Sequence, residues 1–145
     1  MAIAEESINI NAPADSIFDV VANPAKTPEW MPGVSGVINV QGPPGQEGTS
    51  AEYAYSVLGN KFDMNTVVTE VDKPSKLVLQ MEGDFPGTFQ VSLQPQGQAT
   101  RVDLKMEYDL PSGLWARGEN RVTLIRVTQQ NLEEGAEKLR LLCEG

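Results

Sequence analysis

Apolar and polar residues alternate along the middle of the chain, from residue 34 to residue 109. The alternation is clearest near its end, where every second residue from Val102 to Tyr108 is apolar or aromatic and the residues between are charged. One apolar and one polar face are typical of a strand in an antiparallel sheet that is wet on one side. Turn-forming residues divide the segment, and the pattern predicts six strands, at residues 34–41, 49–58, 61–71, 76–82, 88–94 and 99–109.

The part of the chain before residue 34 predicts one more strand and two short helices. Residues 2–10 have the pattern of a strand. Pro13 suits the first position of a helix and Asp15 favours its positive end, so we expect a helix to begin here and to end before Pro24. A second short helix is expected at residues 27–30. The two helices would connect the first strand to the second.

After residue 113 the apolar residues recur at steps of three and four, which is the spacing of an amphipathic helix. We expect one long helix of more than about five turns, in which Gly135 marks a kink or a close packing contact. With no repeat and no linker, the whole chain, 1–145, is expected to form a single domain of the α+β class. The apolar stripe of the helix consists of Ile125, Thr128, Leu132, Ala136, Leu139 and Leu142.

The most informative count in the composition is zero, because the 145 residues include no histidine. This excludes Ser-His-Asp and Cys-His catalysis and the usual zinc sites. No metal and no cofactor is predicted. The formal net charge of −9 repels phosphate backbones and argues against a nucleic-acid partner.

The start of the chain carries Glu5 and Glu6 and no basic residue before residue 10, unlike a signal peptide. No apolar run approaches the roughly 18 residues of a membrane span. The expectation is a cytoplasmic protein without an integral membrane segment. A homodimer stays open as an alternative to a monomer.

Three stretches resemble a known superfamily: residues 8–18, residues 24–32 around Trp30, and residues 106–111 running into the long helix. With the order strand, two helices, six strands and long helix, the chain is similar to the START/Bet v 1-like (SRPBCC, helix-grip) superfamily. Within it, the chain resembles the small bacterial polyketide cyclase/dehydrase-like proteins, over essentially its whole length. The resemblance implies a seven-stranded curved antiparallel sheet wrapped around the long C-terminal helix. It also implies a ligand cavity where helix and sheet diverge, lined by the concave face of the sheet, the N-terminal half of the last helix and the short helices.

This resemblance suggests which residues line the cavity. Large apolar residues are usually buried for packing alone, but small-molecule pockets are mostly apolar with a few polar groups, which three tyrosines could supply here. Arg121 borders the helix stripe and either holds an anionic group of a ligand or points to water. The sequence does not indicate which face of strand 61–71 meets the cavity. The predicted ligand-binding residues are Trp30, Tyr53, Tyr55, Phe62, Met64, Met81, Phe85, Phe89, Tyr108, Trp115 and Arg121.

Three functions remain open at this point. The first is the binding of a small hydrophobic molecule such as a lipid, a quinone or a polyketide-like aromatic. The second is a cyclase/dehydrase-type enzyme that acts on such a ligand without histidine or metal. The third is a co-activator-like protein-interaction module whose cavity is vestigial. An open apolar cavity would favour the first, an open cavity with an acid–tyrosine pair the second, and an interior filled by its own aromatics the third.

No catalytic residue is assigned from the sequence. Several acids could act as a general acid or base if a pocket raised their pKa. Solvated turns and outer strand faces explain them equally well. These acids are Asp63, Glu70, Glu82, Asp84 and Glu119.

Overall fold

The computed structural model describes residues 1–111 and 118–145. Its elements follow the predicted order, with one addition, a short 3-10 helix (η1) between the two short α-helices. Asn23 begins this helix, and its side-chain oxygen accepts a hydrogen bond from the backbone N–H of Ala25 at 3.1 Å. The elements are β1 (Ala2–Ile10), α1 (Ala14–Val21), η1 (Pro24–Lys26), α2 (Thr27–Trp30), β2 (Val34–Gln41), β3 (Ser50–Val57), β4 (Asn60–Asp72), β5 (Lys76–Gly83), β6 (Gly87–Gln96), β7 (Ala99–Tyr108) and α3 (Gly118–Glu144).

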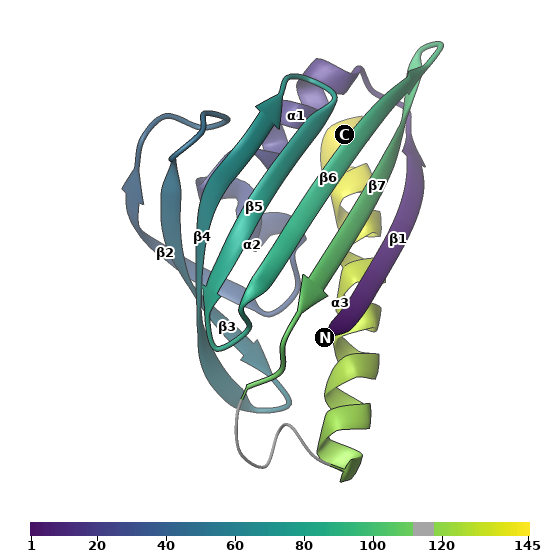
Figure 1. Cartoon of the computed structure of the whole chain (residues 1–145). Coiled ribbons are helices and arrows are strands. Elements are labelled where there is room, and N and C mark those ends of the chain that lie inside the picture. The colour runs from purple at the N-terminus through teal and green to yellow at the C-terminus, as the bar shows by residue number, and fades with distance from the viewer. Residues whose placement is uncertain (112–117) are drawn as a thin grey trace.

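The strands of the described residues form one antiparallel sheet in the order β1-β7-β6-β5-β4-β3-β2 (Figure 1). Neighbours from β2 to β7 are also neighbours in the sequence, joined by short turns. The exception is β1, which pairs with β7, so that Ala2 lies opposite Tyr108 and Ile10 opposite Thr100. The predicted α+β class and the seven-stranded antiparallel sheet are therefore confirmed.

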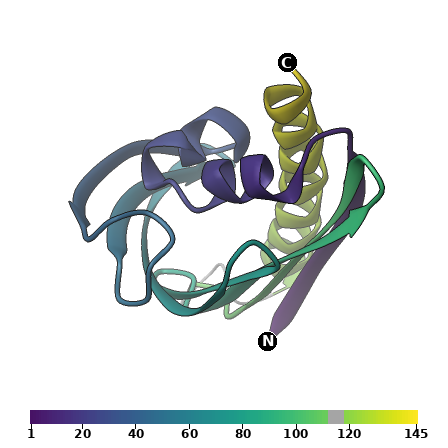
Figure 2. The same ribbon diagram turned by 90° about the horizontal axis from the view of Figure 1, so that it is seen from above.

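The sheet curls into a cup, and α1, α2 and α3 lie across its open side (Figure 2). Inward strand positions supply the core; in β3, for example, every second residue from Ala51 to Val57 is buried. The helix α3 packs along β1 and against α2. Of its predicted stripe, Thr128, Leu132, Ala136 and Leu139 are buried, whereas Ile125 and Leu142 are half-buried. Leu124 rather than Ile125 is the fully buried residue at the start of the stripe.

Contacts at both ends hold the short helices over the sheet. At the α1 end of this segment, the Lys73 ammonium lies 3.3 Å from the Asp19 carboxylate and 5.6 Å from the centre of the Phe18 ring. At the other end, Gly33 has φ +85°, and a Cβ there would lie 2.6 Å from the carbonyl oxygen of Ser56. Only glycine fits this turn, because other residues rarely adopt that conformation and lack the space. The segment from α1 to α2 is thus fixed to β3 and to the β4–β5 turn.

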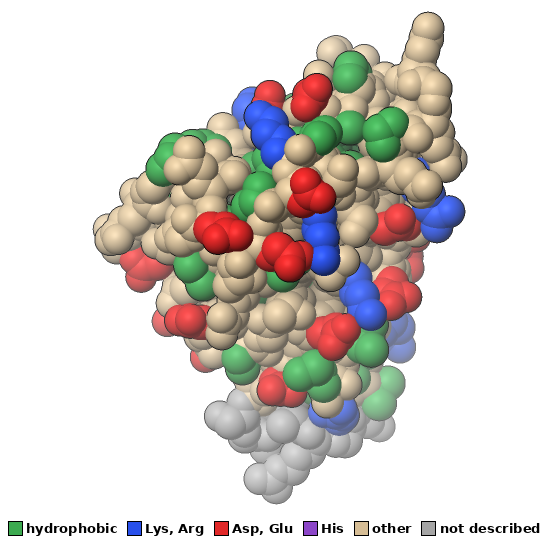
Figure 3. Space-filling model, turned by 45° about the horizontal axis from the view of Figure 1, so that its top comes forward, with side chains coloured by type: hydrophobic (Ala, Val, Ile, Leu, Met, Phe, Trp, Pro, Cys, Tyr) green, Lys and Arg blue, Asp and Glu red, His purple; other side chains and the backbone are tan. Residues whose placement is uncertain are grey.

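Charged side chains stay on the surface. Figure 3 shows acidic side chains spread over one face of the molecule with basic ones between them. Among the described residues, the buried side chains with a hydroxyl or N–H group are those of Trp30, the three tyrosines, Thr49, Thr100 and Thr128, and no buried side chain is charged. Any ligand that enters the interior therefore meets hydroxyls, ring nitrogens and apolar atoms.

Candidate ligand pocket

An apolar cavity of about 50 Å³ lies between the concave face of the sheet and the segment of α1 and α2. Strands β3 to β7 form its floor, and Val21 of α1 and Thr27 of α2 belong to its cover. A smaller cavity of about 20 Å³ continues from it toward Thr49 and shares Thr27 and Tyr53 with it. Among the described residues, no charged side chain lines either cavity.

The cavity lies under the short helices rather than under the long one. No described residue of α3 belongs to its lining. The reason is the position of α3, whose apolar stripe packs along β1 at one edge of the cup, so that α1 and α2 cover the middle (Figure 2). From the resemblance we expected the concave face, the short helices and the N-terminal half of the last helix to line the cavity. The sheet and the short helices do line it, whereas no described residue of the last helix does.

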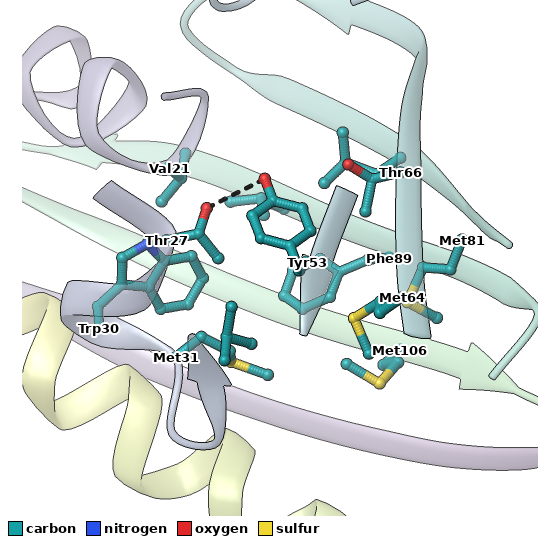
Figure 4. A pocket seen from close by; sticks show the side chains of 13 residues that line it. Val21, Thr27, Trp30, Met31, Tyr53, Met64, Thr66, Met81, Phe89 and Met106 are labelled. Atoms are coloured by element: carbon teal, nitrogen blue, oxygen red, sulfur yellow. Dashed lines mark hydrogen bonds between the residues drawn. The ribbon is translucent and has the colours of Figure 1, made fainter. Parts of the chain in front are cut away.

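Five of the predicted ligand-binding residues line the cavity, and Figure 4 shows their side chains converging from α2 and four strands. The indole of Trp30 packs edge-on against the ring of Phe89, with centroids 6.4 Å apart and planes at 78°. Such T-shaped contacts are favourable and fix both rings. The five residues are Trp30, Tyr53, Met64, Met81 and Phe89.

Other residues of the sheet also line the cavity but were not predicted, although the alternation of apolar and polar residues places them on the same strand faces as predicted ones. Thr66 is two positions after Met64, and Val91 is two positions after Phe89, so each shares a face with a predicted residue. This also answers which face of β4 meets the cavity, namely the face of Met64 and Thr66. Leu79 and Met106 belong to the lining for the same reason.

Lining residues near the short helices carried no comparable signal. Val21 ends α1, whereas Met31 and Val34 flank the turn between α2 and β2. Helices this short and turns between elements have no extended periodicity from which an inward face could be assigned.

Methionine dominates the lining. The chain has five methionines, and four of them, Met31, Met64, Met81 and Met106, line this cavity. Methionine is unbranched and polarizable, so it adapts to irregular spaces and contacts aromatic rings favourably. The pocket wall can therefore change shape by rotation of side chains alone.

The Tyr53 hydroxyl lies 3.5 Å from the Thr27 hydroxyl, at the long limit of a hydrogen bond (Figure 4). Burial raises the pKa of Tyr53, while hydrogen bonding to Thr27 and Thr66 lowers it by less. Tyr53 is thus a neutral phenol at physiological pH, able to donate or accept a hydrogen bond but not to act as a base.

Four other predicted residues form a separate aromatic cluster that lines neither cavity. Phe85 is at its centre, with its ring centroid 5.4 Å from that of Tyr55, 5.1 Å from that of Phe62 and 6.1 Å from that of Tyr108. All four side chains are buried. Here the interior of the cup is filled by the protein's own aromatics.

The remaining two candidates lie elsewhere. Arg121 is exposed near the start of α3 and lines neither cavity. Its charge nevertheless acts on Tyr108, where it lowers the pKa slightly against the larger effect of burial, which raises that pKa. Trp115 lies outside the described residues.

The four candidate acids that the structure describes do not line the cavity. Asp63, Glu70 and Glu82 are exposed, and Asp84 is half-buried and accepts a hydrogen bond from the backbone N–H of Asp63 at 2.7 Å. The carboxylate of Glu70 lies 2.6 Å from the Lys76 ammonium. The side chain of Glu119 is outside the described part. Within that part, no group of acidic and cysteine side chains could hold a metal ion, and no helix is long and apolar enough to cross a membrane.

A cup-shaped antiparallel sheet that holds a long C-terminal helix and an apolar pocket defines the helix-grip class. The chain belongs to the family of polyketide cyclase/dehydrase and lipid transport proteins, whose family model matches residues 1–144. The predicted membership of the START/Bet v 1-like superfamily is confirmed. No curated protein matches the chain.

Solved structures share this fold. TTHA0849 from Thermus thermophilus superposes with a TM-score of 0.81 at 20% identity, covering 95% of this chain and 94% of that one. The ZhuI aromatase/cyclase from a Streptomyces species gives 0.80 at 15% identity, with 98% and 93% covered. A START superfamily protein from Mycobacterium smegmatis gives 0.74 at 20% identity, with 99% and 98% covered. At these identities the likeness establishes the fold.

Proposed function

We propose that the protein binds a small hydrophobic molecule in the cavity between the concave sheet and the α1–α2 segment. The observation that carries this proposal is the lining itself, which is apolar, uncharged and methionine-rich. Binding sites for small molecules are typically apolar with a few polar groups for orientation. Thr27, Tyr53 and Thr66 are the hydroxyl-bearing residues that could provide such groups.

The size of the cavity sets a condition on binding. Pockets for drug-sized ligands enclose roughly 300–1,000 Å³, far more than the space of about 50 Å³ found here. A ligand would therefore enter by displacing side chains. The four methionines make this feasible, because their rotamers can change without movement of the strands.

The family points in the same direction, since polyketide cyclases, dehydrases and lipid transport proteins handle apolar molecules. Lipids, quinones and polyketide-like aromatics are all compatible with this class of ligand. Among them, a compact ring system suits a space of about 50 Å³ better than a long acyl chain does.

A cyclase/dehydrase-type reaction is the second candidate, and the Tyr53–Thr27 hydroxyl pair at the cavity is the feature that favours it. Against it, the described lining contains no carboxylate, and the raised pKa of Tyr53 keeps its phenol neutral. General acid–base catalysis works best when the pKa of the group lies near the working pH. Binding without chemistry is thus the better-supported function.

Titration with the neutral fluorophore N-phenylnaphthylamine tests the proposal. In a Trp115→Phe background, Trp30 is the sole tryptophan, and binding should quench its emission through energy transfer to the probe. The expected result is saturable binding that Val91→Phe, which fills the cavity, weakens by at least about tenfold, equivalent to ~1.4 kcal/mol.

Val122→Phe is the matched control, because it makes the same change at a side chain that is 63% exposed on α3. It should leave the affinity unchanged. Circular dichroism of each variant checks that the fold persists. If the folded protein binds no neutral apolar probe, the small-molecule proposal fails and the interaction module becomes the better explanation.

A further inference from the structure

The Trp30 indole carries a donor without a partner at the wall of the cavity. Its side chain is only 3% exposed, and within the described part of the chain its Nε1 has no hydrogen-bond partner. An indole N–H can only donate. Because the large majority of buried polar side-chain atoms are paired in folded proteins, an unpaired buried donor requires an explanation.

The hydroxyl-bearing residues around the cavity do not supply the acceptor. Figure 4 shows the nitrogen-bearing edge of the indole turned toward Val21 and Thr27, two other residues of the lining. The Thr27 hydroxyl instead pairs with Tyr53 at 3.5 Å. An acceptor could therefore reach Nε1 from the cavity itself, whose volume of about 50 Å³ is ample for one oxygen atom.

The lining also restricts the charge of that acceptor. The part of the lining that the structure describes has no cationic side chain that could neutralise an anion, and the chain as a whole carries a formal charge of −9. An unpaired charge in an apolar interior is strongly disfavoured. A neutral acceptor, such as a carbonyl or ether oxygen or an aromatic nitrogen, avoids this cost.

The donor is held in a fixed position. The edge-on contact with Phe89 holds the ring from the sheet side. On the other side, the Trp30 backbone meets α3 at Gly135, where a Cβ would lie 3.2 Å from the Trp30 carbonyl oxygen. A donor fixed before the ligand arrives loses little conformational entropy on binding and selects by geometry.

We infer that the Trp30 indole N–H is the specificity-determining hydrogen-bond donor of the pocket, and that it selects neutral cyclic ligands bearing a hydrogen-bond acceptor. This inference rests on the proposed function and narrows its ligand class. It also assigns the polar contact with the ligand to Trp30 instead of Arg121, which is exposed and lines neither cavity.

Tetralone and tetralin form a matched pair of probes, because they share one bicyclic skeleton and differ by a carbonyl group. The wild-type protein should bind tetralone more tightly than tetralin by about three- to tenfold, the range expected for one net hydrogen bond. Trp30→Phe keeps an aromatic ring and removes the N–H, so it should bind both probes with similar affinity. Tyr53→Phe, which removes one of the hydroxyls of the lining and leaves the indole N–H in place, should keep most of the preference.

Nuclear magnetic resonance of the wild-type protein gives a second measurement that does not depend on how well Trp30→Phe folds. The Trp30 indole N–H resonance should move downfield with tetralone and much less with tetralin, and Trp115→Phe assigns the two indole signals. Equal affinity for both probes, with no selective shift, would overturn the inference and mean that water or no acceptor serves the donor. If neither probe binds, the proposed function itself fails, and the inference fails with it.

Discussion

The hydroxyls of the three tyrosines have different surroundings, although all three side chains are buried. The Tyr53 hydroxyl meets Thr27 at the cavity, and the Tyr55 hydroxyl accepts a hydrogen bond from the Asn131 side chain at 3.2 Å. The Tyr108 hydroxyl has no hydrogen-bond partner in the described part of the chain. Thr128 lies close enough to lower the pKa of Tyr108, but its hydroxyl donates to the carbonyl of Leu124 at 2.8 Å.

Two phenylalanine substitutions exploit this difference. Tyr108→Phe removes a buried hydroxyl that makes no hydrogen bond, so the free energy of unfolding should stay the same or rise by about 1 kcal/mol. Tyr55→Phe removes the partner of Asn131 and should lower it by about 1 kcal/mol. Urea unfolding of both variants measures the pair. A clear loss of stability in Tyr108→Phe would mean that its hydroxyl is paired in solution.

At the scale of single residues, the sequence predicted which side chains point into the cup. It did not predict which of them line the cavity and which pack in the aromatic cluster. Alternation predicted that Tyr53 and Tyr55 point inward, and both do. Yet Tyr53 lies opposite Met64 at the cavity, whereas Tyr55 lies opposite Phe62 in the packed cluster. Two residues along β3 separate a side chain that lines the cavity from one that packs in the aromatic cluster. Which of the two lies at the cavity depends on the curvature of the whole sheet, which the local pattern does not contain.

At the scale of elements, the residue pattern predicted the strands and the long helix to within a few residues. The period of two and the turn residues between strands are local properties, which is why this succeeded. The pattern predicted Ile125 as the start of the buried stripe of α3, and this was wrong. Leu124 and Ile125 lie four and three positions before Thr128, and both spacings place a residue on the same face of a helix. The structure buries Leu124. The 3-10 helix η1 was not predicted, because a proline at position 24 indicates the end of α1 and does not by itself indicate that another helix begins there.

Gly135 was expected to mark a kink or a close contact, and the structure shows the contact. A Cβ there would lie 3.2 Å from the Trp30 carbonyl oxygen and 3.3 Å from both the Met31 sulfur and Cδ of Pro32. Gly135→Ala gains about 1 kcal/mol of helix propensity, but overpacking typically costs about 1–3 kcal/mol. Because two of the three neighbours are a backbone oxygen and a proline ring, which cannot rotate away, the cost should prevail.

The expected outcome of Gly135→Ala is therefore a loss of about 1 kcal/mol in the free energy of unfolding, measured with urea. The near-ultraviolet circular dichroism of Trp30 should change as well, because the substitution pushes on the element that carries it. A stabilisation of about 1 kcal/mol, as in an open helix, would show that α3 stands farther from α2 in solution.

At the scale of the molecule, hairpin order from β2 to β7 follows from short turns, but two features needed more than local pattern. The pairing of β1 with β7 brings together the two ends of the sheet's sequence, and nothing in either strand specifies the other. The closure of the cup by helices was implied by the family resemblance. The resemblance implied a cavity lined by the short helices and by the N-terminal half of α3, but no described residue of α3 lines it, because α3 packs along β1.

The interior combines a small cavity with a packed aromatic cluster, and this has a consequence for the whole fold at high pH. The chain has three tyrosines, all of them buried, and burial raises the pKa of each above its usual value. Below a pH of about 10 the tyrosines are neutral in both the folded and the unfolded state. As the pH rises further, the unfolded chain loses phenolic protons that the folded protein keeps, so stability falls.

We therefore expect tyrosinate to form only when the protein unfolds. The stability should decrease by roughly 1.4 kcal/mol per pH unit for each tyrosine between its unfolded and its folded pKa. The ultraviolet absorbance of tyrosinate and the circular dichroism of the sheet should then change together, in one cooperative step above pH ~10. The urea-unfolded protein is the reference and should titrate gradually near pH ~10. Gradual ionisation at that pH in a protein that keeps its sheet would show that water reaches the tyrosines, and that the interior of the cup is more open than the small cavity and the aromatic cluster indicate.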